Sequence, residues 1–196
     1  MNNQDQIRIR VKQAYTWIAE HPDAAPIFPT GRALAEGVGY PPDLLDTLPS
    51  ASVEAFCGLS NVSVFAELPG GATVLEVGCG AGLDTLIAAR RTGAEGKVIA
   101  VDFSMAMLDR ARDSAQEAGI DNVEFLCADA EKLPVPNGSI DVAIVNGIFN
   151  LNPRRDQIFS ELARVVKPGG AVYAAEIVLA GPLPKGERES ADNWLS

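Results

Sequence analysis

The stretch VLEVGCGAGLDTLIAARR, from Val74 to Arg91, constrains the fold more than any other part of the chain. A short apolar run leads into three glycines at every second position, and a helical pattern of apolar residues follows. A strand that turns through glycines into a helix is typical of parallel α/β sheets, and the turn lets the backbone approach a nucleotide-like ligand closely. The stretch therefore predicts a ligand site at the end of a first strand.

Short β-type runs alternate with helical patterns through the rest of the chain. The predicted strands are residues 73–77, 97–102, 123–129, 140–146 and 171–179, and the predicted helices between them are residues 84–93, 105–118 and 154–166. This alternation predicts a three-layer, Rossmann-like α/β fold, in which mostly parallel strands carry helices on both faces. Ligands of such sheets bind outside the carboxyl ends of the strands.

The residues before the first strand follow a different pattern. Residues 7–20 form a predicted amphipathic helix with four apolar residues near one face: Ile7, Val11, Tyr15 and Ile18. The segment after it is rich in proline, glycine and alanine, with short helical turns. We expect three parts: a helical cap over the ligand edge at residues 1–72, a ligand-binding core at residues 73–180, and a tail at residues 181–196.

Charge and composition exclude several classes of partner. The net charge is −10, and no cluster of lysine and arginine is longer than a pair, which disfavours nucleic acid. No apolar run reaches the roughly 20 residues that span a bilayer, so no membrane association is expected. The N-terminus lacks the apolar core of a secretory signal, which predicts a cytoplasmic protein. The only histidine, His21, is expected at the surface.

The glycine turn fits a dinucleotide fingerprint poorly. The pattern G-x-G-x-x-G needs a third glycine where this chain has Leu83. Asp102, however, ends the second predicted strand about 20 residues after the turn, where a carboxylate accepts both ribose hydroxyls of an adenosine. Such a hydrogen bond to a charged group contributes roughly 1.5–3 kcal/mol. A nicotinamide-dependent oxidoreductase is the alternative, and the missing glycine argues against it.

Several motifs in order point to one family. Glu76 lies two residues before the first glycine in EVGCGAG, and VDFS, ADAEKLP and VVKPGG follow along the chain. Together they resemble the class I S-adenosylmethionine-dependent methyltransferases over residues 74–179. The resemblance implies S-adenosylmethionine as the cofactor, S-adenosylhomocysteine as its product, and a small-molecule methyl acceptor. A cofactor without phosphates does not need the third glycine.

The resemblance also assigns roles to residues that follow the predicted strands. It implies that Glu76 supports the turn near the methionine ammonium, and that Asp102 holds the ribose. It implies that Phe103 flanks the adenine and that Asn146 presents its backbone to the ammonium. The remaining implied contacts are with the aminoacyl part, from Gly78, Cys79 and Gly80, and with the adenine edge, from Asp129 and Ala130.

Further motifs narrow the likeness to one branch. GYPPDLLDTLP, NGIFNLNP and VLAGPLP are similar to the arsenite methyltransferases and their relatives, the ubiquinone and menaquinone methyltransferases. That branch binds its metalloid through converging cysteine thiolates. Here Cys57 is in the cap and is the candidate ligand, Cys79 is in the turn, and Cys127 is expected to point into the core. Three thiolates do not converge in this arrangement, so no metal site is predicted.

The acceptor and the catalytic residues are not apparent from the sequence. The absence of an obvious histidine or lysine base favours an acceptor that is already nucleophilic, such as a thiolate, a trivalent arsenical or a stabilised carbanion. Relatives of this kind continue past Ser196 with a cysteine-bearing segment and two strands. We therefore expect the C-terminal strands of the usual seven-stranded sheet to be missing. A cofactor-binding module or a truncated fragment with little turnover is the alternative, and a homodimer is one candidate assembly.

Overall fold

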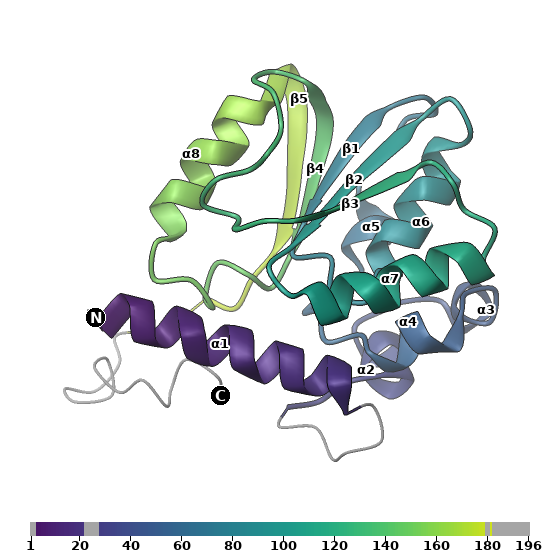
Figure 1. Ribbon diagram of the computed structural model, residues 1–196. Coiled ribbons are helices and arrows are strands. Elements are labelled where there is room, and N and C mark those ends of the chain that lie inside the picture. Colours follow the sequence, from purple (N-terminus) through teal and green to yellow (C-terminus); the bar gives the residue numbers. More distant parts are fainter. Residues whose placement is uncertain (1–2, 22–27, 179–180, 182–196) are drawn as a thin grey trace.

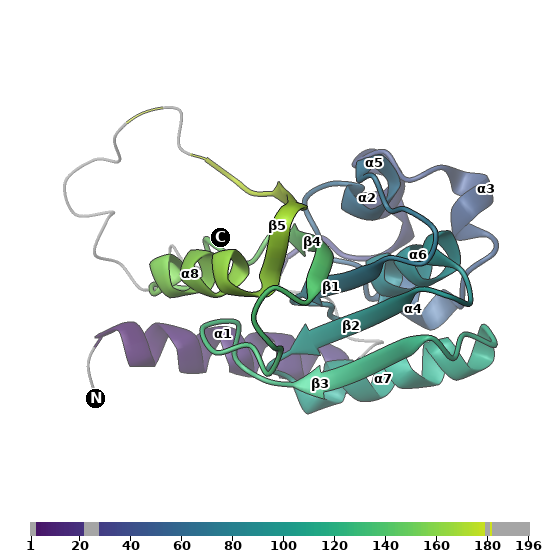
Figure 2. The ribbon, with the colours of Figure 1, turned by 90° about the horizontal axis from the view of Figure 1, so that it is seen from above.

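The computed structural model describes residues 3–21, 28–178 and 181 of the 196-residue chain. Its centre is a sheet of five strands in the order β3-β2-β1-β4-β5, and every neighbouring pair is parallel (Figures 1 and 2). The strands are β1 (Thr73–Val77), β2 (Lys97–Asp102), β3 (Val123–Cys127), β4 (Ile140–Asn146) and β5 (Val166–Ala175). The predicted Rossmann-like α/β architecture is confirmed for this part of the chain.

Helices cover both faces of the sheet, as the alternation predicts. The helices of the core are α6 (Leu83–Thr92), α7 (Met105–Glu117) and α8 (Arg155–Val165). Leu75 and Val77 of β1 pack with the α8 residue Ile158, whereas Val74, the residue just before them, packs with Ala88 of α6. Because successive strand residues point to opposite faces, α6 and α8 lie on opposite sides of β1.

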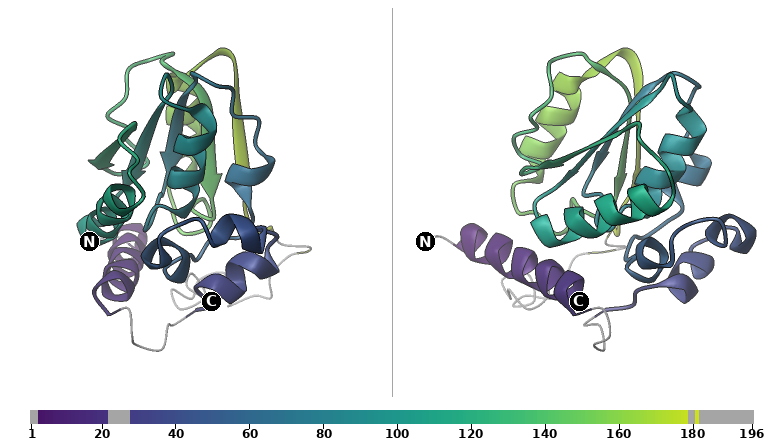
Figure 3. Two further views of the ribbon diagram at one scale, coloured as in Figure 1. Left: turned by 90° about the vertical axis from the view of Figure 1, so that its right-hand side faces the viewer. Right: turned by 45° about the vertical axis from the view of Figure 1, so that its right-hand side comes forward.

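The cap consists of one long helix and several short ones. They are α1 (Asn3–Glu20), α2 (Arg32–Gly37), α3 (Pro42–Leu45), α4 (Ser50–Glu54) and α5 (Val62–Phe65). The predicted amphipathic face of α1 is confirmed, since Ile7, Val11 and Ile18 are buried. Figures 1 and 3 show α1 crossing one end of the sheet next to α7. The division at residue 72 stays a prediction, and of the tail only Gly181 lies within the described residues.

Strand boundaries differ from the prediction at two places. The third strand ends at Cys127 rather than at residue 129. The fifth begins at Val166 and ends at Ala175, where its pairing with Asn146 stops. The strand begins early because Val166 already pairs with Ile140. A shift in the pairing register then accommodates residues 167–170, KPGG, whose sequence predicts an interruption of the strand.

Cys127 corrects one prediction. The thiol was expected in the core, but Cys127 is exposed. Its strand, β3, pairs with β2 alone, and its residues are half-buried or exposed. An apolar run predicts a strand without indicating whether that strand is central or at an edge, and the end of an edge strand has a covering neighbour on one side only.

Candidate ligand-binding site

A cavity opens at the carboxyl ends of β1, β2 and β4, between the sheet and helix α1. The elements just after these strands supply most of its wall, and the cap supplies the rest. Eight residues predicted to bind the ligand line it: Glu76, Gly78, Cys79, Gly80, Asp102, Phe103, Ala130 and Asn146. The structure thus brings together residues that are up to 70 positions apart in the sequence.

The glycine turn after β1 requires glycine for two reasons. Gly78 has a φ of +79°, and a Cβ at this position would collide with the Ile148 side chain. Gly80 has a φ of +52°, and a Cβ there would meet no protein atom within 4 Å. The backbone N–H groups of Gly78 and Cys79 both donate to the carbonyl of Val101, at 2.8 and 3.1 Å. The turn is thereby fixed against β2 with open space above Gly80.

Asp102 braces this turn from the end of β2. One carboxylate oxygen accepts the N–H of Gly80 at 2.9 Å, and the other accepts the N–H of Ser104 at 2.8 Å. Burial raises the pKa of Asp102, and these backbone hydrogen bonds oppose the increase. Ser104 caps α7, as predicted, by accepting the N–H of Met107. Asp102 therefore links the glycine turn to the start of α7.

Glu76 is buried beneath the turn. Its carboxylate accepts a hydrogen bond from the hydroxyl of Thr85, in the first turns of α6. Burial raises the pKa of Glu76 well above its ordinary value, and the neighbouring carboxylate of Asp84 raises it further. A ligand that brought a positive charge next to Glu76 would favour the ionised form of this group.

The Asn146 side chain holds the cap against the core. Its Oδ1 accepts the N–H groups of Leu59 and Ser60 at 2.8 and 3.2 Å. Its Nδ2 donates to the Ser60 carbonyl at 2.7 Å and to Asp84 at 2.9 Å. The resemblance implied only a backbone contact from Asn146. The structure adds a side-chain role, in which the Asn146 amide satisfies the backbone hydrogen-bonding groups of Leu59 and Ser60.

Asp84 is a site residue that sequence reasoning missed. Buried in the first turn of α6, it accepts hydrogen bonds from the hydroxyls of Tyr40 and Ser63, from the Ser63 N–H at 3.2 Å, and from Asn146. It also lines the cavity. The sequence did contain one indication, which is an aspartate in the mostly apolar first turns of a helix. A carboxylate that is buried there needs several hydrogen-bond donors around it.

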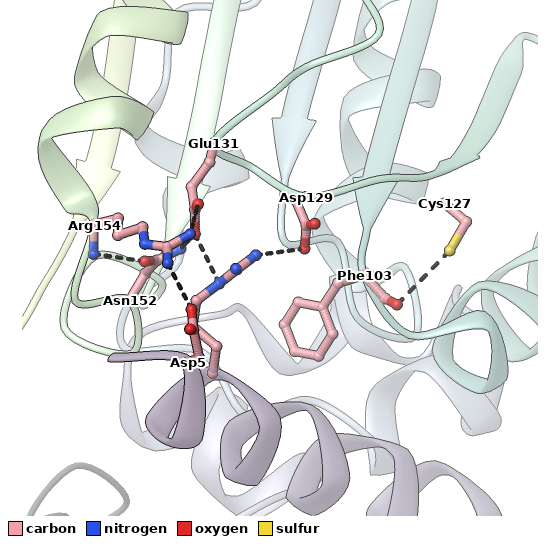
Figure 4. Close-up of polar contacts among 8 residues, drawn as sticks. Asp5, Phe103, Cys127, Asp129, Glu131, Asn152 and Arg154 are labelled. Carbon is pink, nitrogen blue, oxygen red and sulfur yellow. Dashed lines mark hydrogen bonds and ion pairs between the residues drawn. The ribbon is translucent and has the colours of Figure 1, made fainter. Parts of the chain in front are cut away.

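Asp129 lies at the rim and outside the residues that line the cavity. Its side chain is 60% exposed and pairs with Arg8 of α1 at 3.1 Å. The same arginine contacts Glu131 at 2.9 Å, and Glu131 also pairs with Arg154. Figure 4 shows Asp129 and Glu131 with their polar contacts, and Phe103 nearby. Periodicity gave no sign of the Arg8 contacts, because they join segments more than 100 residues apart.

The three cysteines occupy different environments. Cys57 and Cys79 line the cavity, and burial raises the pKa of the Cys57 thiol to about 12. Cys127 lies outside the lining, with its Sγ 3.7 Å from the Phe103 carbonyl oxygen. Within the described part of the chain, no three His, Cys, Asp or Glu side chains are grouped to hold a metal ion. His21 is exposed and stacks on Trp17.

Comparison with known proteins assigns the family. The family described as "Methyltransferase domain" matches residues 69–195. The chain belongs to this methyltransferase family. An arsenite methyltransferase from Halobacterium salinarum is 36% identical over 151 residues, which cover 76% of this chain and 38% of the relative. A ubiquinone/menaquinone biosynthesis C-methyltransferase from Hahella chejuensis is 39% identical over 108 residues, covering 54% and 43%.

Solved structures agree with this assignment. An arsenic (III) S-adenosylmethionine methyltransferase from Chlamydomonas reinhardtii aligns with a TM-score of 0.63 and 27% identity, over 82% of this chain and 54% of that one. A SAM dependent methyltransferase from Aquifex aeolicus aligns with a TM-score of 0.53 and 25% identity, over 83% and 81%. The predicted resemblance to S-adenosylmethionine-dependent methyltransferases is confirmed. The methyltransferase chain spans less than half of the two curated relatives, and none of its described helices is long and apolar enough to cross a bilayer.

Proposed function

We propose that this chain is an S-adenosylmethionine-dependent methyltransferase domain that acts on a small molecule. The observation that carries the proposal is the convergence, on one cavity at the carboxyl edge, of the glycine turn, Asp102 and Phe103. In this arrangement the carboxylate of Asp102 holds the ribose hydroxyls and the Phe103 ring flanks the adenine. The open backbone at Gly80 receives the aminoacyl part.

The charge of the cavity supports the same ligand. Glu76, Asp84 and Asp102 are buried and line the cavity, whereas Arg8, the one arginine among the described lining residues, is 26% exposed and paired with Asp129. S-Adenosylmethionine carries a positive sulfonium and a positive ammonium group, and buried carboxylates favour such a ligand over a dinucleotide with its pyrophosphate. Within the proposal, Glu76 lies near the ammonium, while Ala130 and the rim carboxylate Asp129 meet the adenine edge. Cys79 and Gly78 contribute backbone groups to the aminoacyl end.

Chemistry at this site depends on alignment. The bound cofactor supplies an electrophilic methyl group, and the chain must orient an acceptor in line with it. Such proximity and orientation can contribute about 7–11 kcal/mol. Among the described residues that line the cavity there is no histidine or lysine, which supports an acceptor that needs no general base.

A trivalent arsenical is the acceptor class that we propose, because its lone pair is nucleophilic without loss of a proton. Two relatives named arsenite methyltransferase and the presence of Cys57 in the cavity wall support this choice. Cys57 would bind arsenic as a thiolate by displacing a hydroxide or a glutathione thiolate from it, and the Cys57 proton would leave with the displaced group as water or glutathione thiol. The cytoplasmic location and a homodimer stay predictions.

Two measurements test the proposal. Titration calorimetry with S-adenosylhomocysteine should show binding to one site, and no heat of binding would contradict the cofactor assignment. Incubation with S-adenosylmethionine, arsenite and glutathione should then yield methylated arsenic detectable by mass spectrometry. Cys57→Ser should reduce that product while leaving S-adenosylhomocysteine affinity unchanged. Cofactor binding without methylation of arsenite, thiols or demethylmenaquinone would favour the alternative of a cofactor-binding module.

A further inference from the structure

Five charged residues join helix α1 to the two loops that follow β3 and β4. Arg8 contacts Asp129 at 3.1 Å and Glu131 at 2.9 Å, and Arg154 contacts Asp5 at 2.6 Å and Glu131 at 3.4 Å. We call these residues the charged clasp. Figure 4 shows Glu131 between Arg154 and Asp129, with Asp5 below them on α1. The clasp lies beside the cavity wall, since Arg8 lines the cavity, as does Ala130, which stands between Asp129 and Glu131 in the chain.

Glu131 is the centre of the clasp. Only 8% of its side chain is exposed, whereas the other members are 26–60% exposed. Its Oε1 also accepts the amide of Asn152 at 2.9 Å. An arginine can contact two carboxylates at once through its planar fork, which a lysine cannot reproduce. Arg8 uses its Nε for Glu131 and a terminal nitrogen for Asp129, so one side chain ties α1 to the buried carboxylate and to the rim.

The two halves of α1 are attached by different interactions. In the C-terminal half, Ile18 and Ala19 pack with Met107 of α7, and the Thr16 hydroxyl is 3.1 Å from that of Ser104. In the N-terminal half Ile7 and Val11 are buried as well, and the clasp adds ion pairs through Asp5 and Arg8. Ion pairs in contact with water weaken with salt, and apolar packing does not. The attachment of the N-terminal half therefore has a component that salt can weaken, and the attachment of the C-terminal half through Ile18 and Ala19 does not.

We propose that Glu131, Arg8 and Arg154 are positioning residues that hold α1 as a wall of the cofactor cavity, so that the clasp must open when cofactor enters or leaves. This inference rests on the proposed function. It implies that Asp129 has two partners, Arg8 when the helix is closed and the adenine edge in the proposed complex. It also implies that the rate of ligand release depends on the ion pairs between α1 and the loops.

The test measures the dissociation rate of S-adenosylhomocysteine by stopped flow, in wild type and three variants. Arg8→Gln should raise the rate on the order of tenfold, because the largely buried carboxylate of Glu131 loses one of its two arginine partners. Asp5→Asn should raise it roughly threefold, although Asp5 does not line the cavity. Arg32→Gln, which removes the same charge from an exposed ion pair of α2 outside the cavity, should leave the rate unchanged.

Salt and a conservative variant separate positioning from a general loss of stability. Raising NaCl from about 0.05 to about 0.5 M should accelerate release from wild type more than from Arg8→Gln, because two of the four ion pairs of the clasp are absent in the variant. The release rate of Arg8→Lys should lie between those of wild type and Arg8→Gln, because a lysine keeps the charge without the planar fork. Unchanged release in both Arg8→Gln and Asp5→Asn would overturn the proposal, as would equal salt dependence in all variants. If Arg8→Gln fails to fold, Asp5→Asn decides. Failure of wild type to bind S-adenosylhomocysteine would instead overturn the proposed function, and this inference with it.

Discussion

Asp102 combines a structural contact with its proposed binding role. Both of its carboxylate oxygens already accept backbone N–H groups, from Gly80 and Ser104. Each oxygen has a second lone pair, so the same group can accept a ribose hydroxyl without losing these bonds. The sequence placed Asp102 by its separation from the glycine turn. Only the structure showed that it also orients the turn.

Replacing Asp102 with alanine should weaken S-adenosylhomocysteine binding. The lost hydrogen bonds to a charged group correspond to about 1.5–3 kcal/mol, or roughly a ten- to hundredfold increase in Kd. Titration calorimetry checks the value, and Asp109→Ala, an exposed aspartate on the adjacent helix α7, is the matched control. An unchanged Kd in Asp102→Ala would refute both the ribose contact and the proposed cofactor site.

Glu76→Gln should make the stability of the fold less sensitive to a rise in pH above about 4.5. Because the folded pKa of Glu76 lies well above its ordinary value of 4.5, the folded chain holds a proton that the unfolded chain releases. Stability of the wild type therefore falls as pH rises from about 4.5 toward the folded pKa. Gln has no such proton, so the Tm difference, variant minus wild type, should increase between about pH 5 and pH 8.

Glu161 supplies the opposite case as a control. Its hydrogen bonds from Arg164 hold its pKa below the ordinary value of 4.5, so its stabilising effect is present above that value and is lost as pH falls through the folded pKa. Glu161→Gln should shift Tm by the same amount across about pH 5 to pH 8. A Tm difference for Glu76→Gln that is equally flat over this range would contradict the raised pKa.

At the scale of elements, the junction of cap and core depends on α6. Asp84, in its first turn, accepts hydrogen bonds from Tyr40, from Ser63 at the start of α5, and from Asn146 at the end of β4. These three donors come from elements that are separate in the sequence. The Asp84 carboxylate thus joins the cap to the core, and it helps to position the nearby part of the cavity wall that contains Cys57 and Gly58.

Asp84→Ala should destabilise the chain by about 3 kcal/mol, because several buried donors lose their acceptor together. This corresponds to a Tm decrease of roughly 6–12 °C for a domain of this size. Urea denaturation measures the change, with the exposed Asp113→Ala on α7 as control. A loss smaller than about 0.5 kcal/mol, the range of ordinary surface substitutions, would show that the network does not hold the cap.

Elements also differ in how well their sequence predicts them. The three central strands match the prediction at both ends, and they are residues 73–77, 97–102 and 140–146. The edge strands β3 and β5 differ at their ends. An edge strand has one partner, so its length depends on where that partner strand ends. The pattern of apolar residues within the edge strand does not indicate where its partner ends.

On the scale of the whole molecule, cofactor binding should stabilise the fold. The cavity is formed jointly by α1, the loop at residues 56–58 and the ends of β1, β2 and β4, so a ligand there binds the folded chain alone. A free ligand concentration of about 100 times Kd should raise the free energy of unfolding by about 2.7 kcal/mol, which corresponds to an increase in Tm of roughly 5–10 °C. Differential scanning fluorimetry with S-adenosylhomocysteine tests this. The same concentration of NADH should give no shift, and equal shifts would favour a dinucleotide site.

The sequence by itself determined the alternation of strands and helices, the glycine turn and the position of Asp102 relative to it. These features follow from local periodicity, from the backbone freedom of glycine and from fixed separations along one chain. Tertiary structure alone decided the exposure of Cys127, the four hydrogen bonds of Asn146, the role of Asp84 and the contact of Arg8 with Glu131. Each of these depends on which strand lies at the edge, or on segments distant in sequence meeting at one end of the sheet, and no local pattern encodes such a meeting.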